Sequence, residues 1–349
     1  MPAWFVVTDR AFGEMLATTA PARPGSPWAP GGAALTLGQA IDAVVQRTDA
    51  DASQKAALIR QLWAEVRLPP ALEADIVAAY RQLGDGSGPY VAIRSSAREE
   101  DTEAATRAGE FDTFLFIRGA DAMLAHLRRA WSGLWTARAI HERAVGGRSG
   151  RGEGGGVLVQ RIAWSRVAGV LQTINAAEGR TREMVIDVGL GLGEGVVSGR
   201  VSADHVVVSK DEDPEREPLR FRYVTADKRE RVVFDERTGT GTVRTDVLSH
   251  QRLRAALEYV ELVELVRVAT RLEAAYGYPL DIEFGFEGTD LRILQVRPVP
   301  GSAAVWRDTR DRYPLTTGTT AAARPGPEAA RGDPLSRQRE NSEAVHDPA

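Results

Sequence analysis

Three segments of this chain combine residue types and spacings that suit the binding of phosphate groups. The first is residues 94–97 (Arg-Ser-Ser-Ala), at the end of a β-rich run. The planar guanidinium of Arg94 can hold a phosphate through paired hydrogen bonds, and neighbouring hydroxyls and backbone amides can add donors. The alternative is an ordinary ion pair between Arg94 and one of the acidic residues that follow it, Glu99, Glu100 or Asp101.

The second segment is rich in glycine. Residues 189–195 read Gly-Leu-Gly-Leu-Gly-Glu-Gly and lead into Val-Val-Ser-Gly. Glycine lets the backbone approach a ligand closely, and it also allows the positive φ angles of tight turns. The spacing fits no G-x-G-x-x-G dinucleotide fingerprint, and no lysine follows the glycines as in a P-loop. The segment is therefore either a ligand-binding loop or a tight turn from a strand to a helix.

The third segment is a predicted hairpin that turns at residues 288–290. Asp281 and Glu283 share one face of its first strand, and Gln295 and Arg297 share one face of its second, because residues two apart in a strand point the same way. If the strands pair, carboxylate, carboxamide and guanidinium groups converge. Hard oxygen ligands suit Mg²⁺, and an arginine beside them suits phosphate. The alternative is a solvated sheet face with an ordinary Glu–Arg pair.

Composition excludes several other classes of protein. The chain has 349 residues, of which 43% are hydrophobic and 26% charged, and a formal net charge of −4 with both signs interspersed. This balance is typical of a globular protein and does not favour nucleic acid as a partner. No apolar run approaches the roughly 18 residues of a membrane span, and the first residues do not resemble a signal peptide. The absence of cysteine excludes disulfides and is compatible with a cytoplasmic protein.

The elements that must position these residues follow from hydrophobic periodicity. The pattern predicts an α+β fold. Expected strands are 4–8, 90–95, 157–160, 167–173, 183–188, 280–286 and 291–297, and expected helices are 38–48, 53–66, 71–83, 120–145 and 250–276. In the helix at 120–145, Trp131 and Trp135 fall on the apolar face and are expected in the core. We expect one large domain over 1–300, subdivided near 175–180, and a disordered tail or linker over 301–349.

In this order, the segments resemble the nucleotide-binding domain shared by phosphoenolpyruvate synthase, pyruvate phosphate dikinase and rifampicin phosphotransferase. Residues 4–8 resemble the Pro-Gly-Phe-Val-Val-Thr strand of that family, and residues 91–97 resemble its Val-Ala-Val-Arg-Ser-Ser-Ala. The resemblance covers about residues 3–300. It continues in the segments 108–115 (Ala-Gly-Glu-Phe-Asp-Thr-Phe-Leu), 131–135 (Trp-Ser-Gly-Leu-Trp), 159–161 (Val-Gln-Arg), 191–199, 281–283 (Asp-Ile-Glu) and 294–298 (Leu-Gln-Val-Arg-Pro).

The resemblance implies an ATP-grasp fold with ATP and Mg²⁺ bound between two α+β subdomains. It implies that Arg94 and Arg297 grip the triphosphate and are the catalytic candidates, and that Gly109 and Thr113 line the phosphate side of the site. It also implies that Gln160 borders the adenine and that Glu194 belongs to the nucleotide site. Finally, it implies that Glu283 and Gln295 contact the nucleotide and hold Mg²⁺.

The resemblance further implies a phosphoryl transfer from ATP to a histidine on a swivelling domain. None of the five histidines here lies in the family's Gly-Gly-x-x-Ser/Thr-His context, so we expect that histidine on a separate domain or partner chain. The alternatives are a non-catalytic ATP-binding or regulatory module and an ATP-grasp ligase that joins a carboxylate to an amine. The final acceptor, whether pyruvate, an antibiotic or a glucan, is not specified by the sequence.

Two departures from the family concern charge at the phosphates. The family carries a Gly-Gly-Lys segment ahead of its first strand, whereas the first lysine here is Lys55. Arg10 or Arg23 are the candidates to replace the family's lysine. Glu110 stands where the family usually has glutamine, which adds negative charge. We therefore expect ATP binding to persist more readily than turnover.

Overall fold

The computed structural model describes residues 1–21, 26–28, 34–84, 88–97, 113–145 and 155–299. These residues form two antiparallel sheets, one of four strands and one of six, and a separate two-stranded hairpin. Helices and strands are mixed along the chain, so the predicted α+β class is confirmed. The tail expected at 301–349 lies outside the described residues.

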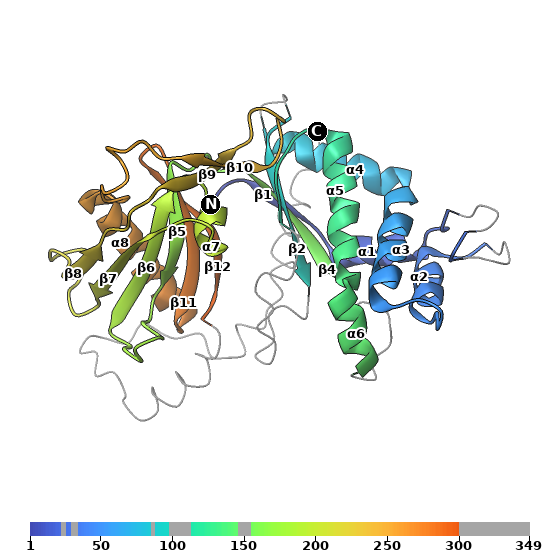
Figure 1. The fold of residues 1–349 in the computed structure, drawn as a ribbon, viewed down its shortest axis with the longest axis horizontal. Coiled ribbons are helices and arrows are strands. Elements are labelled where there is room, and N and C mark those ends of the chain that lie inside the picture. The colour runs from blue at the N-terminus through green and yellow to red at the C-terminus, as the bar shows by residue number, and fades with distance from the viewer. Residues whose placement is uncertain (22–25, 29–33, 85–87, 98–112, 146–154, 300–349) are drawn as a thin grey trace, which may run out of the picture. The chain divides into compact units, whose positions relative to one another are not determined.

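The four-stranded sheet has the order β1-β4-β2-β3. Its strands are β1 (Trp4–Val7), β2 (Val91–Ala97), β3 (Thr113–Ile117) and β4 (Gly155–Arg161). Helices pack on one of its faces (Figure 1), namely α1 (Asp9–Ala17), α2 (Leu37–Val45), α3 (Ala52–Glu65), α4 (Pro70–Gln82), α5 (Ala120–Ser132) and α6 (Ala137–Val145). Alternate strand residues such as Val157 and Val159 point toward the helices and are fully buried.

The core under these helices is built around aromatic rings. Trp63, Trp131 and Trp135 lie near Phe12, with ring centroids 5.6–6.2 Å apart. Trp131 and Trp135 are 1% and 2% exposed, so their predicted place in the core is confirmed. Such rings bury large apolar areas and fix the helices against the sheet.

The single helix expected over 120–145 is wrong, because the chain breaks it near its middle. A short 3₁₀ turn, η1 (Gly133–Trp135), separates α5 from α6. Thr136 then takes an extended conformation, with φ −64° and ψ 158°. Its Oγ1 accepts a hydrogen bond from the backbone N–H of Ala139 at 3.1 Å, which is how a threonine begins a new helix.

The six-stranded sheet has the order β12-β11-β5-β6-β7-β8. Its strands are β5 (Val167–Gln172), β6 (Glu183–Leu190), β7 (Asp204–Ser209), β8 (Phe221–Val224), β11 (Leu280–Glu287) and β12 (Asp290–Pro298). The remaining elements are the short helix α7 (Gly193–Val197), the long helix α8 (Tyr259–Tyr276), and a hairpin of β9 (Glu230–Phe234) and β10 (Thr242–Asp246). Helix α8 packs on this sheet and closes a second core.

Helix α8 begins nine residues later than the 250–276 pattern predicts. Glu258 and Glu261 form a reciprocal capping box that starts the helix at Tyr259. The backbone N–H groups of Ala256 and Leu257 bond to side chains of β7 and β8 instead of continuing a helix. Tertiary contacts therefore override the helical pattern in this segment.

The chain passes from the first sheet to the second at residues 162–166, between β4 and β5. The division expected near 175–180 instead falls inside the β5–β6 hairpin, whose two strands both belong to the six-stranded sheet. An aromatic cluster surrounds the crossing, in which Trp164 packs against Tyr90, Phe116 and Phe234 with ring centroids 5.0–5.7 Å away.

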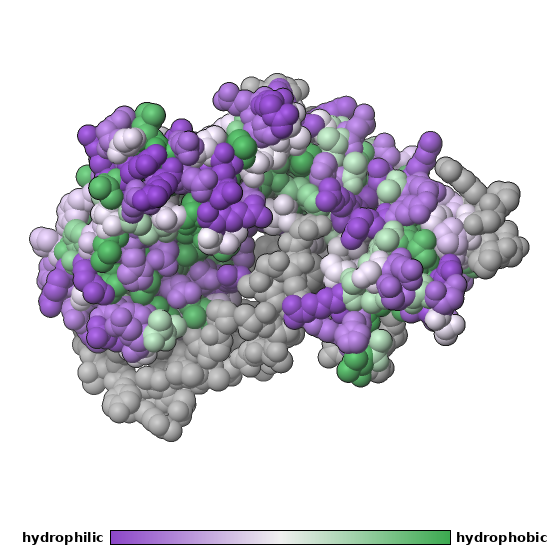
Figure 2. Space-filling view, viewed as in Figure 1, coloured by the Kyte–Doolittle hydropathy of each residue, from purple (hydrophilic) through white to green (hydrophobic). Residues whose placement is uncertain are grey.

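Hydrophilic residues predominate on the face of the molecule shown in Figure 2, and hydrophobic residues are scattered among them. Scattered apolar residues are normal on a protein surface. Within the described ranges, no helix combines the length and the apolar character needed to cross a bilayer.

Candidate functional site

A β-bulge in the β11–β12 hairpin brings four polar side chains together. Near the turn the register pairs Glu287 with Asp290 and Phe284 with Ile293. A shift between Glu283 and Phe284 then leaves Leu294 as an extra residue. Beyond it, Glu283 pairs with Gln295 and Asp281 pairs with Arg297. Residues that pair directly across antiparallel strands share a face, so all four point the same way. Without the bulge, Glu283 would pair with Leu294, and Gln295 and Arg297 would lie on the opposite face.

Arg94 reaches this face from the other sheet. Its Nη1 donates hydrogen bonds to Glu283 Oε2 at 3.1 Å and to Gln295 Oε1 at 2.9 Å. The Nε of Arg94 is buried and has no hydrogen-bond partner. The side chains of Arg94 and Glu283 are 22% and 17% exposed, so the pair is partly desolvated. The acidic residues at 99–101, which were the alternative partners of Arg94, lie outside the described residues.

Arg297 pairs with the carboxylate directly across the hairpin. Its Nε donates to Asp281 Oδ2 at 2.9 Å, and its Nη2 lies 2.8 Å from the same oxygen. The Arg297 side chain is 32% exposed, whereas the Asp281 side chain is 8% exposed. The structure thus contains both the convergent cluster and an ordinary acidic partner for Arg297, which is Asp281 and not Glu283.

Thr113 and Gln160 lie on the same sheet face as Arg94. In the four-stranded sheet, Thr113 pairs with Arg94, and Arg94 pairs with Leu158. Gln160 lies two residues further along β4 and pairs with Trp4 of β1. This face is opposite to the one covered by helices, because Val157 and Val159 alternate with Leu158 and Gln160. One open face of the sheet therefore carries Thr113, Arg94 and Gln160.

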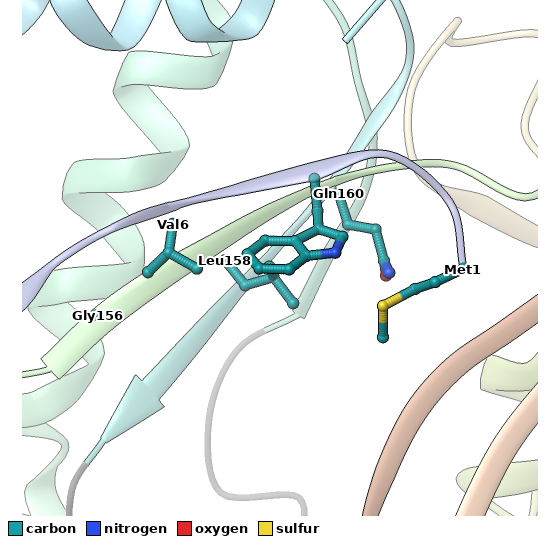
Figure 3. A pocket seen from close by; sticks show the side chains of 6 residues that line it. Met1, Val6, Gly156, Leu158 and Gln160 are labelled. Atoms are coloured by element: carbon teal, nitrogen blue, oxygen red, sulfur yellow. The ribbon is translucent and has the colours of Figure 1, made fainter. Parts of the chain in front are cut away.

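A pocket of about 320 Å³ opens on this face (Figure 3). Its lining is mostly apolar and consists of Met1, Trp4, Val6, Gly156, Leu158 and Gln160. Figure 3 shows the carboxamide of Gln160 extending from β4 toward Met1. Gln160 is 2% exposed, and its Nε2 has no hydrogen-bond partner. A buried donor without a partner costs free energy, so this amide favours a ligand that supplies an acceptor.

The glycine-rich segment forms the tight turn between β6 and α7. Gly191 has a φ of +84°, and a Cβ there would lie 2.3 Å from the carbonyl oxygen of Val232. Only glycine fits that position, because the backbone of β9 packs against it. Glu194 lies on α7, where its Oε2 accepts from Thr242 Oγ1 at 2.7 Å and its Oε1 accepts from Arg200 Nη1 at 3.2 Å. Among the described residues, the hydrogen bonds and ion pairs of Glu194 go to Thr242 and Arg200 and not to the Arg94 cluster.

Some predicted residues lie elsewhere or outside the described ranges. Gly109 and Glu110 belong to the undescribed residues. Of the three lysines, Lys55 lies on α3, Lys210 pairs with Glu273, and Lys228 is fully buried. The cations that the structure places at the cluster of Glu283 and Gln295 are thus guanidinium groups.

Glu283 and Gln295 offer the oxygen ligands that Mg²⁺ prefers. Within the described residues no group of three or more acidic or histidine side chains is arranged to hold a metal. Mg²⁺ usually needs fewer, because it keeps several waters and takes other ligands from phosphates. The two oxygens already converge on one cation, the Nη1 of Arg94. The donor set therefore fits a magnesium ion that is shared with a phosphate ligand.

Two features of the site were missed from the sequence. The bulge at Leu294 leaves no composition signal, because it depends on how the strands pair. Trp4 and Leu158 give the pocket its apolar walls. The alternation of exposed and buried residues in β1 and β4 could have placed them on one face, since Phe5 and Val7 have apolar partners in the helical core.

The chain resembles known proteins over most of its length. Residues 1–312 match the family model described as pyruvate phosphate dikinase, AMP/ATP-binding domain. A probable phosphoenolpyruvate synthase from Pyrococcus horikoshii is 33% identical over 277 residues, which are 76% of this chain and 33% of that protein. A rifampicin phosphotransferase from a Streptomyces species is 32% identical over 302 residues, which are 86% of this chain and 32% of that protein.

The chain spans about a third of the length of these relatives. The match over residues 1–312 covers both sheets and every element of the site described above. It supports ATP binding and a kinase-type role for the module. The chain belongs to the family of pyruvate phosphate dikinase AMP/ATP-binding domains.

Proposed function

We propose that this chain binds ATP with Mg²⁺ in an ATP-grasp arrangement and transfers a phosphoryl group to a histidine on a separate domain or partner chain. The observation that carries the proposal is the convergence of Arg94 from one sheet with Glu283 and Gln295 from the other. Family membership supports the nucleotide, and the relatives named phosphoenolpyruvate synthase and rifampicin phosphotransferase support the transfer.

The guanidinium groups supply the anion-binding half of the site. Only Nη1 of Arg94 bonds to Glu283 and Gln295, and its buried Nε has no partner. A phosphate oxygen would satisfy this donor in a charge-assisted hydrogen bond. The Arg297 side chain is partly exposed, at 32%, and can meet a second phosphate oxygen. Thr113 pairs with Arg94 across the sheet, so its hydroxyl is a further donor on the same face.

Charge balance explains why a divalent cation belongs in the proposal. The cluster contains two guanidinium groups, of Arg94 and Arg297, and two carboxylates, of Asp281 and Glu283, so its formal charges cancel. A triphosphate carries several negative charges, and these arginines alone do not offset them. Glu283 and Gln295 would hold Mg²⁺, which neutralises charge on phosphate oxygens.

The remaining task of the protein in the transfer is to position the reacting groups. Phosphoryl transfer requires mainly that the attacking and leaving groups lie in line and that developing charge is stabilised. Arg94 and Arg297 would hold the phosphate oxygens from two directions, and Gln160 would border the adenine. The acceptor histidine nitrogen would attack a phosphorus of the bound nucleotide from a separate domain, and the bond from that phosphorus to the leaving phosphate oxygen would break. Glu194, which bonds to Thr242, would stabilise the turn beside the nucleotide.

Calorimetry with ATP and Mg²⁺ tests the binding half of the proposal. We expect micromolar binding by the wild-type chain and a large loss in Arg297→Ala and Arg94→Ala. Arg267→Ala is a matched control, because its guanidinium pairs with Glu215 away from the cluster. Absence of ATP binding by the wild-type chain would contradict the proposal.

The transfer half needs a second measurement. ATP labelled on its phosphates would be incubated with this chain and with a histidine-carrying domain taken from a related full-length synthase. Acid-labile, base-stable label on that domain supports phosphohistidine. ATP binding without any labelling would instead favour the second candidate, a non-catalytic ATP-binding or regulatory module. The observation in its favour is that Lys210 and Lys228 are both committed to ion pairs with Glu273 and Asp204.

A further inference from the structure

The apolar pocket on the open sheet face has an aromatic wall. Trp4 lines it from β1, the edge strand of the four-stranded sheet, and is 48% exposed. Val6 is 43% exposed on the same side of β1. Exposed apolar side chains that gather around a concave site usually mark a binding surface. The flat face of an indole is best suited to another flat ring.

Strand register connects this pocket to the cluster that would hold phosphate. Trp4 pairs with Gln160, and Gln160 pairs with Ala92 of β2. Arg94 lies two residues from Ala92 on the same face of β2. Trp4 and Arg94 are thus two strands apart sideways and two residues apart lengthways, or about 12 Å between backbones by normal sheet spacings. A nucleoside triphosphate can span that separation with its phosphates at Arg94 and its base at Trp4.

One polar atom in the pocket lacks a hydrogen-bond partner. Gln160 Nε2 is a hydrogen-bond donor that is buried and unpaired, in a side chain that is 2% exposed. The pocket's other side chains come from Met, Trp, Val and Leu residues and offer no strong acceptor. A purine ring carries unprotonated nitrogens at its edge, which accept hydrogen bonds while its faces remain free to stack.

We propose that the indole of Trp4 stacks on the nucleobase and that this contact makes the site prefer purine over pyrimidine nucleotides. The inference rests on the proposed nucleotide-binding function and goes beyond it, because it assigns Trp4 as a specificity-determining residue. Stacking strength rises with ring area, so a two-ring base gains more from the indole than a one-ring base does. The Gln160 amide orients the same base through its edge.

Calorimetry with a set of ligands tests this inference separately from phosphate binding. The ligands are ATP, CTP and inorganic tripolyphosphate, each with Mg²⁺. We expect Trp4→Ala to weaken ATP binding about tenfold, to weaken CTP binding less, and to leave tripolyphosphate binding unchanged. Trp4→Phe should retain most of the ATP affinity, since a smaller aromatic face remains. Arg94→Ala should weaken all three ligands together.

Tyr276→Ala is the matched control, because Tyr276 is an aromatic side chain of similar exposure, 50%, on α8. It should leave all three affinities unchanged. Fluorescence gives a second readout: part of the quenching on ATP binding should vanish in Trp4→Phe, although six other tryptophans remain.

The possible outcomes separate this inference from the function on which it rests. Wild-type affinity for ATP in Trp4→Ala would overturn the stacking role while leaving ATP binding intact. An equal loss of ATP and tripolyphosphate binding in that variant would also overturn it, because the effect would not involve the base. A wild-type chain that binds neither ligand would overturn the proposed function and this inference with it.

Discussion

Two charged clusters of this protein differ in how fully their charged groups are paired. The first lies inside the six-stranded half, where Asp204 and Lys228 are both 0% exposed and lie 2.5 Å apart. The oxygens of Asp204 accept three further hydrogen bonds, from Tyr223 and from the backbone of Ala226 and Ala256, each at 2.8 Å. The second is the partly exposed cluster of Arg94, which keeps a buried donor unpaired.

The difference supports the proposal that the Asp204 cluster holds the fold and that the Arg94 cluster binds a ligand. Buried charges are tolerated when each has partners, as Asp204 and Lys228 have. Their contacts join β7, β8 and the segment before α8 into one unit. The Arg94 cluster joins two sheets through a single guanidinium nitrogen and is only partly exposed to solvent. A buried cluster whose groups are all paired is costly to break, whereas a cluster with an unpaired donor can accept another partner.

The largest effect on stability is expected from breaking the buried cluster around Asp204. Lys228→Met leaves the Asp204 carboxylate buried without its cation, which should destabilise the protein by about 3–5 kcal/mol. Urea unfolding of the full chain measures this. Arg229→Met is the neighbouring control, because Arg229 is 75% exposed in an ion pair with Asp227 and its loss should change the unfolding free energy little. Similar losses of unfolding free energy in both variants would show that breaking the buried pair costs no more than breaking an exposed one.

The second prediction concerns the Arg94 cluster. Arg94→Ala should weaken ATP binding by about 1.5–3 kcal/mol, or roughly 10- to 150-fold, because charged hydrogen bonds to phosphate are lost. Its unfolding free energy should fall less than that of Lys228→Met, since Glu283 keeps 17% of its surface in water. Arg94→Lys keeps the positive charge but loses the planar fork of the guanidinium. Its ATP affinity should therefore lie between those of the wild type and Arg94→Ala. A stability loss as large as that of Lys228→Met, with ATP affinity unchanged, would assign Arg94 to the fold instead.

A third prediction changes one charge of the Arg94 cluster while keeping its shape. Glu283→Gln removes a negative charge beside the proposed phosphate position, so ATP without metal should bind more tightly, by about 1 kcal/mol. With Mg²⁺ present the same variant should bind ATP more weakly, because a carboxylate ligand has become an amide. Calorimetry with and without Mg²⁺ checks the change of sign. A shift in the same direction under both conditions would remove Glu283 from the proposed metal site.

The sequence predicted the local parts of this site better than the way they meet. The strands at 280–286 and 291–297 are close to the observed β11 and β12, because alternation and a Gly-Thr-Asp turn are local signals. The bulge at Leu294 was not predicted, although it decides that Glu283 faces Gln295. A shift of the strand register by one residue changes no pattern that can be read from the sequence. It nevertheless moves every side chain of the strand to the opposite face of the sheet.

Long-range contacts account for most of the remaining differences. Strands β3 and β7 to β10 and helix α1 were not predicted. Asp204 and Lys228 are 24 residues apart, and nothing in their spacing shows that they form a buried pair. The segment before α8 carries a helical pattern, but its backbone amides bond to Asp204 and Tyr223. Local pattern is a weak guide where buried polar groups in other elements capture the backbone.

The smallest loss of stability is expected when one hydroxyl is removed from the buried cluster around Asp204. Tyr223→Phe removes the hydrogen bond from the phenol to Asp204 Oδ2 and the one that the phenol accepts from the backbone N–H of Leu257, but it leaves Lys228 and two backbone donors on that carboxylate. The loss should therefore be about 1 kcal/mol at neutral pH, measured by urea unfolding.

The pH dependence of that loss gives the sharper test. Burial raises the pKa of Tyr223 above its ordinary value of 10, and the nearby Asp204 carboxylate raises it further. A proton bound more tightly in the folded state gives stability that is present below the unfolded pKa and is lost as the pH rises above it. The stability difference between the wild type and Tyr223→Phe should thus be constant from pH 7 to 9 and should shrink above about pH 10. A difference that stayed constant into the alkaline range would mean that the phenol is not held in its protonated form by this cluster.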